Sequence, residues 1–70
     1  MTTYYDYYWH SADVNDLLPL LADEPNIIGP RQGDDNQWYI AVRTATPRAT
    51  PDNCIVTDTA VAQALLGVWA

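Results

Sequence analysis

The chain has 70 residues, which suffices for a single domain with one core, and its single cysteine excludes an internal disulfide. Nine acidic residues stand against three arginines and no lysine, and the formal net charge is −6. That balance argues against direct binding to nucleic acid or to anionic membranes, because both require a basic surface. It suits solubility or docking onto a basic partner.

The small size of the chain also limits how the domain can be stabilised. Domains this small usually rely on disulfides, a metal ion or association. One histidine and one cysteine cannot build the usual four-ligand zinc site, so we expect association with a partner or with itself. No signal peptide is evident, and no apolar run approaches the roughly 20 residues of a membrane span. We therefore expect synthesis in the cytoplasm and no membrane contact.

The first predicted element is an aromatic strand over residues 3–9, where five of the eight aromatic residues of the chain lie. Alternation along a strand separates its side chains into two rows. One row consists of Tyr5, Tyr7 and Trp9, and the other of Tyr4, Asp6 and Tyr8. One aromatic row can be buried, but burying both requires cover from two sides. The strand is therefore either core or binding surface.

A helix is predicted over residues 12–22. Its apolar stripe has helical spacing and comprises Val14, Leu17, Leu18 and Leu21. Pro19 is tolerated in a first turn, but in a helix interior it costs about 3 kcal/mol. We therefore predict a kinked or two-part helix that ends before Pro25.

A β-hairpin is predicted next, pairing residues 26–32 with residues 37–45 through a turn at Gly33–Asn36. In the second strand Trp38, Ile40 and Val42 share one face, which places Tyr39 on the opposite, outward face. The alternative is that residues 26–30 form only a loop and that residues 3–9 pair directly with residues 37–45.

The last third of the chain is predicted to be a connector, a short strand and a helix. The connector at 46–53 contains two prolines, and residues 54–56 can form a short strand. Thr57 is the expected cap of a helix that ends at Gly67, followed by a short C-terminal tail. The expected buried face of that helix consists of Val61, Ala64, Leu65 and Val68. The fold class is a small α+β domain over residues 1–70, in the order β-α-β-β-α.

Residues with reactive side chains do not form a recognisable catalytic or metal-binding pattern. His10 has no nucleophile motif beside it, and Cys54 precedes two β-branched residues, as a buried apolar thiol does. The Asp34–Asn36 cluster lacks the regular spacing and the distal glutamate of a calcium loop. We expect no catalytic residue, no cofactor, no metal and no small-molecule substrate.

The aromatic residues are therefore the candidate functional residues, as a protein interface. Tyrosine offers rigid apolar area with a polar tip, which suits such a surface. Trp69 lies at the end of the chain and needs cover. The candidate interface residues are Tyr4, Tyr8, Tyr39 and Trp69.

Three segments carry a resemblance to a known group of proteins: the aromatic opening at 4–9 before a leucine-rich helix, the strand Trp38–Arg43, and the ending Gly67–Ala70. Together they resemble small acidic proteins of tailed bacteriophages and prophages, of the kind encoded near tail or tail-fibre genes. The chain lacks the central insertion between helix and hairpin that is expected in that group. The resemblance brings no catalytic residues with it.

The resemblance implies a structural or accessory virion protein of the tail or fibre region. It would contact another phage structural protein, itself as a homo-oligomer, or both, after synthesis in the host cytoplasm. The alternative is a phage-encoded acidic inhibitor of a host defence or nucleic-acid enzyme, since a small acidic domain can occupy a basic groove.

Overall fold

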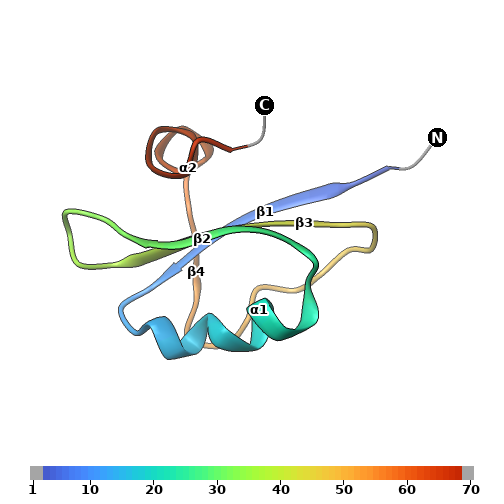
Figure 1. The fold of residues 1–70 in the computed structure, drawn as a ribbon, viewed down its shortest axis with the longest axis horizontal. Coiled ribbons are helices and arrows are strands. Elements are labelled where there is room, and N and C mark those ends of the chain that lie inside the picture. The colour runs from blue at the N-terminus through green and yellow to red at the C-terminus, as the bar shows by residue number, and fades with distance from the viewer. Residues whose placement is uncertain (1–2, 69–70) are drawn as a thin grey trace.

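A four-stranded antiparallel sheet lies between two short helices in the computed structural model, which describes residues 3–68 (Figure 1). The elements in chain order are β1 (Tyr5–Ser11), the 3₁₀ helix η1 (Val14–Asp16), α1 (Leu18–Asp23), β2 (Asn26–Gln32), β3 (Trp38–Thr44), β4 (Ile55–Val56) and α2 (Thr59–Leu66). The strand order across the sheet is β2-β3-β1-β4. The predicted α+β class and element order are confirmed.

Strand β3 is the centre of the sheet and pairs with both β1 and β2. Its register with β1 runs from Tyr5 opposite Thr44 to Ser11 opposite Trp38. The predicted hairpin of β2 with β3 is confirmed, so residues 26–30 are part of a strand. The register shifts between Ile28 and Arg31, around the cis peptide bond Gly29–Pro30. Strand β1 also pairs directly with β3, as the alternative predicted, but the loop that the alternative placed at residues 26–30 is not present.

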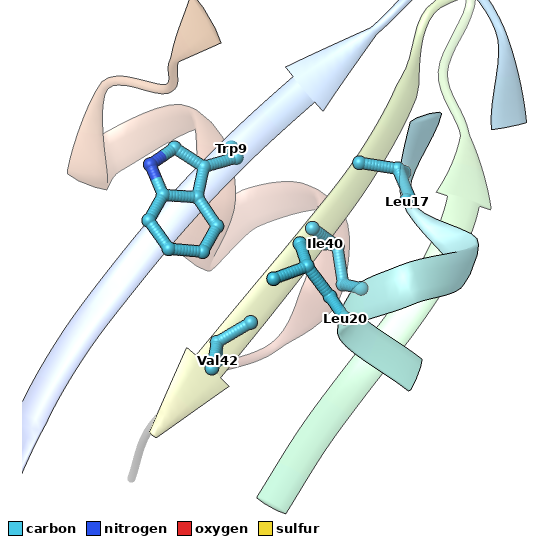
Figure 2. Packing of buried hydrophobic residues seen from close by; sticks show 5 residues of the cluster. All are labelled: Trp9, Leu17, Leu20, Ile40 and Val42. Atoms are coloured by element: carbon cyan, nitrogen blue, oxygen red, sulfur yellow. The ribbon is translucent and has the colours of Figure 1, made fainter. Parts of the chain in front are cut away.

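The two faces of the sheet are covered by different helices, α1 on one side and α2 on the other (Figure 1). The α1 side holds the larger core cluster, in which Trp9, Ile40 and Val42 of the sheet meet Leu17 and Leu20 (Figure 2). The α2 side is built from small side chains, Ala41, Ala62 and Val68. The sheet is therefore covered on both sides, and both rows of the aromatic strand contribute to packing in its second half, through Tyr7 and Trp9 on one side and Tyr8 on the other.

The first helix is divided as Pro19 predicts, but its buried face differs from the predicted stripe. The 3₁₀ turn of η1 ends at Asp16, and α1 then begins at Leu18 with Pro19 in its first turn. Because the break resets the helical phase, Leu17 and Leu20 are buried, whereas Leu18 and Leu21 are exposed. The prediction that Leu18 and Leu21 belong to the buried stripe is wrong.

The buried face of α2 also differs from the prediction. Ala62 and Val68 are buried, while Val61 and Ala64 are exposed. The N-cap is Asp58, whose side chain accepts a hydrogen bond from the N–H of Ala60, and not Thr57. The helix therefore starts one residue later than expected. Gly67 ends it with a left-handed φ of 69°, as predicted.

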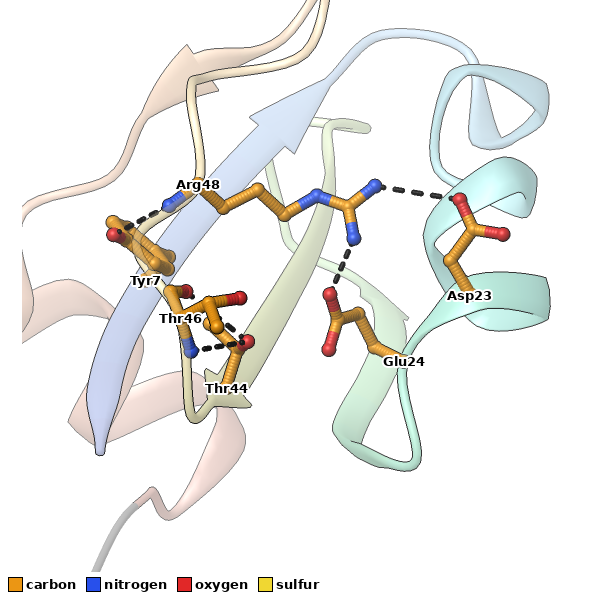
Figure 3. Close-up of polar contacts among 6 residues, drawn as sticks. All are labelled: Tyr7, Asp23, Glu24, Thr44, Thr46 and Arg48. Carbon is orange, nitrogen blue, oxygen red and sulfur yellow. Dashed lines mark hydrogen bonds and ion pairs between the residues drawn. The ribbon is translucent and has the colours of Figure 1, made fainter. Parts of the chain in front are cut away.

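The connector between β3 and β4 is attached to both the sheet and α1 (Figure 3). The guanidinium of Arg48 forms ion pairs with Glu24 and Asp23. The backbone N–H of Arg48 donates a 2.9 Å hydrogen bond to the hydroxyl of Tyr7. These contacts join residues 46–53, which have no regular secondary structure, to the elements on either side. Within residues 3–68, no helix is long and apolar enough to cross a membrane.

Candidate protein-interaction surfaces

The aromatic strand β1 changes from exposed to buried along its length. Tyr4 and Tyr5 are 51% and 40% exposed, whereas Trp9 is 1% exposed. Between them, the ring of Tyr7 stacks on that of Trp9 with centroids 5.1 Å apart. The second half of β1 is therefore core, and its first half is open surface.

We call the open end of β1 the β1-end patch and define it as Tyr4, Tyr5, Asp6 and Arg43. Arg43 lies opposite Asp6 on β3, and its Nε donates a 2.7 Å hydrogen bond to the Asp6 carboxylate. The guanidinium carbon of Arg43 also lies 5.9 Å from the ring centroid of Tyr4. The hydrogen bond to Asp6 raises the pKa of Arg43. Tyr4 of the patch thus lies beside an ordered ion pair.

Tyr8 occupies a half-buried position on the α2 side of the sheet. It packs against the cluster of Ala41, Ala62 and Val68. Burial, assisted by the charge of Asp6, raises the pKa of its hydroxyl. Of these two predicted interface residues, Tyr4 is therefore exposed, and Tyr8 contributes to packing.

Tyr39 is 8% exposed, so the expectation that it lies on an outward face is wrong. The face of β3 that carries it is covered by α2, which the alternation of β3 alone does not reveal. Its hydroxyl donates a 2.6 Å hydrogen bond to Asp35 in the hairpin loop. Trp69, the fourth predicted interface residue, lies outside the described residues.

The edge strand β4 exposes two apolar side chains that the sequence did not single out. Ile55 and Val56 are 61% and 65% exposed, the highest values among the large apolar residues of the described chain. β4 pairs with β1 on one side and is the last strand in the sheet order. The available sequence signal was a pair of adjacent β-branched residues after a proline-containing connector. This signal predicted the strand but not its position at the edge of the sheet.

A second surface feature is a shallow groove between the hairpin loop and α2, with a volume of about 410 Å³. We call it the α2 groove. Its lining residues are Gly33, Asp34, Asp35, Tyr39, Val61, Ala64 and Leu65. The sequence did not reveal it, because Val61, Ala64 and Leu65 were assigned to the buried face of the helix.

The side chains considered for catalysis have structural partners. Nδ1 of His10 lies 2.8 Å from Oγ1 of Thr57, in a hydrogen bond whose direction depends on the ring tautomer. Cys54 packs against the α1-side core, and burial raises the pKa of its thiol. Among residues 3–68 no group of three or more histidine, cysteine, aspartate and glutamate side chains is placed to hold a metal ion.

Comparison with known proteins finds no matching family model, no matching curated protein and no matching solved structure.

Proposed function

We propose that this chain is a small structural or accessory protein of a phage particle, in the tail or fibre region, that acts through protein–protein contacts rather than catalysis. The phage context comes from the sequence resemblance. The observation that carries the proposed mode of action is the exposure of Tyr4 and Tyr5, at 51% and 40%.

Tyr5 is the first residue of β1 and Tyr4 directly precedes it, so the two exposed rings lie together at one end of the sheet. Aromatic side chains are enriched at the centres of protein interfaces, where their burial contributes much of the binding free energy. The ion pair of Arg43 with Asp6 beside them fixes part of the patch before any partner binds. A partner that covers the sheet end would therefore bury both rings.

Symmetry would strengthen such a contact. The patch is small, and a single copy would give a weak interface. Several copies around a tail or fibre would engage several such interfaces at once, and the combined avidity exceeds that of one contact. Repeated contacts of this kind would allow a domain of only 70 residues to remain bound in an assembly.

The proposal is tested by quantitative peptide mass spectrometry on purified phage particles from the source of the gene. We expect the protein at a level stoichiometric with known tail proteins. Its absence from particles, together with its presence in infected cells, would overturn the virion proposal. That outcome would favour the acidic inhibitor, which competition with nucleic acid at rising salt would then test, since mimicry weakens with ionic strength.

A further inference from the structure

We propose that the α2 groove binds a protein segment that carries an arginine or lysine next to an apolar side chain. This inference goes beyond the proposed function, because it concerns a second surface and assigns the chemistry of the partner. It does not depend on the protein belonging to a phage particle.

The groove has one apolar wall and one acidic wall. The apolar wall is the outer side of α2, formed by Val61, Ala64 and Leu65. The opposite wall is the hairpin loop, which contributes Asp34 and Asp35. A side chain lying in the groove would contact aliphatic carbon along one side and carboxylate oxygen along the other.

One carboxylate of the acidic wall, that of Asp35, is held in place before any ligand binds. The carboxylate of Asp35 accepts hydrogen bonds from the hydroxyl of Tyr39 at 2.6 Å and from the backbone N–H of Gln37 at 3.0 Å. Tyr39 itself is held in the central strand by its pairing with His10. An ordered carboxylate loses little conformational entropy when a cation binds. It therefore binds a cation more favourably than a mobile carboxylate would.

Arginine and lysine match this combination, because each carries an aliphatic stem with a charge at its end. Of the described residues that line the groove, none is basic, so the two carboxylates face no lining cation. The net charge of −6 would also attract a basic segment and orient its approach.

The same charge argues against a second copy of this chain as the occupant. Two copies would each bring a net charge of −6. Of the three arginines, Arg43 is bonded to Asp6 and Arg48 to Asp23 and Glu24. Arg31 donates to the carbonyl of Leu65, beside the groove of its own copy. The partner is therefore a different, basic chain.

The test uses the full chain, ¹⁵N-labelled, titrated with three peptides in amide-detected NMR. The peptides are acetyl-Leu-Arg-Leu-amide, the same peptide with citrulline, and the same peptide with glutamate. Citrulline has nearly the shape of arginine without its charge. We expect saturable shifts at the amides of Gly33, Val61 and Leu65 with the arginine peptide. The citrulline peptide should bind about two- to fivefold more weakly, and the glutamate peptide more weakly still.

A pair of matched variants tests whether Asp35 supplies the charge that binds the arginine peptide. Asp35→Asn keeps an oxygen that accepts from the backbone N–H of Gln37, places an amide that can donate to the hydroxyl oxygen of Tyr39, and removes the charge. It should weaken binding of the arginine peptide about two- to fivefold and leave binding of the citrulline peptide unchanged. Asp52→Asn removes an exposed charge from the connector and should leave the binding of both peptides unchanged.

Four outcomes would overturn the proposal. The first is no saturable shift with the arginine peptide, and the second is equal binding of the citrulline peptide. The third is a shift pattern centred on the β1-end patch or on β4. The fourth is a shift of the groove amides with rising protein concentration in the absence of peptide, which would identify a second copy as the occupant.

Discussion

The hydroxyl of Tyr39 and the carboxylate of Asp35 form a 2.6 Å hydrogen bond that joins the central strand to the hairpin loop. The residues are four apart in sequence, and both line the α2 groove. The hydrogen bond from Tyr39 is the largest cause of a lowered pKa of Asp35. The same bond raises the pKa of Tyr39.

Replacing Tyr39 with phenylalanine should raise the pKa of Asp35 toward its ordinary value of about 3.9. Because the folded-state pKa of Asp35 is lowered, its ionised form contributes stability above about pH 4, and that contribution is lost as pH falls through the folded-state pKa. The difference in unfolding free energy between the wild type and Tyr39→Phe should therefore be largest near neutral pH and shrink below pH 4. Carboxyl-detected NMR titration measures the pKa, and urea unfolding measures the difference. An unchanged pKa of Asp35 in the variant would contradict the assignment.

The buried face of α2 is tested by comparing two alanines of the same helix. Ala62 is fully buried between the helix and the sheet, whereas Ala60 is exposed. Ala62→Leu should destabilise the domain by about 1–3 kcal/mol, because the small-residue cluster has no space for the added carbons. Ala60→Leu should change stability by less than about 0.5 kcal/mol. Thermal melting of both variants gives the comparison, and equal effects would mean that the helix is rotated relative to this structure.

Two glycines with positive φ should respond differently to substitution by alanine. Gly67 has a φ of 69° and open space around it, so Gly67→Ala should cost about 1 kcal/mol through backbone strain alone. Gly29 has a φ of 100°, and a Cβ there would lie 2.8 Å from the carbonyl oxygen of Tyr39. Gly29→Ala should therefore cost more than about 2 kcal/mol. Chemical denaturation of both variants decides the order, and the reverse order would show that β2 approaches β3 less closely.

The attachment of the connector to α1 is tested at Arg48. Arg48→Met keeps the aliphatic stem but removes the guanidinium that pairs with Asp23 and Glu24, leaving the partly buried Glu24 carboxylate without this cation. We expect a loss of about 1–2 kcal/mol. Arg31→Met is the control, since the guanidinium of Arg31 makes an exposed contact with the carbonyl of Leu65, and it should cost less than about 0.5 kcal/mol. Similar melting temperatures for the two variants would show that Arg48 does not hold the connector.

The strands were predictable from sequence because their signals are local. The alternation of Trp38, Ile40 and Val42 predicted β3 and its buried face. The turn at Gly33–Asn36 predicted the hairpin, because those residue types favour turns regardless of the surroundings. The division of the first helix followed in the same way from Pro19.

The helix faces and the interaction surfaces were less predictable because they depend on packing. A 3₁₀ turn before α1 shifted the phase of the leucines, and apolar spacing alone does not detect such a shift. In α2, either Val61 or Ala62 could belong to the buried apolar face. Ala62 is the buried one, because it packs in the cluster of small side chains around Ala41. The burial of Tyr39 followed from α2 crossing that face of the sheet, which involves residues distant in sequence.

The most direct test of the proposed assembly role compares two double variants for incorporation into phage particles. One is Tyr4→Ala with Tyr5→Ala, in the β1-end patch, and the other is Leu18→Ala with Leu21→Ala, which removes apolar residues of similar exposure from α1. Each is supplied in place of the wild-type protein, and copies per particle are counted by quantitative mass spectrometry, with melting temperatures as a check of folding. We predict that the tyrosine variant folds but is lost from particles while the leucine variant is retained. Incorporation of the tyrosine variant at the wild-type level would contradict the proposal.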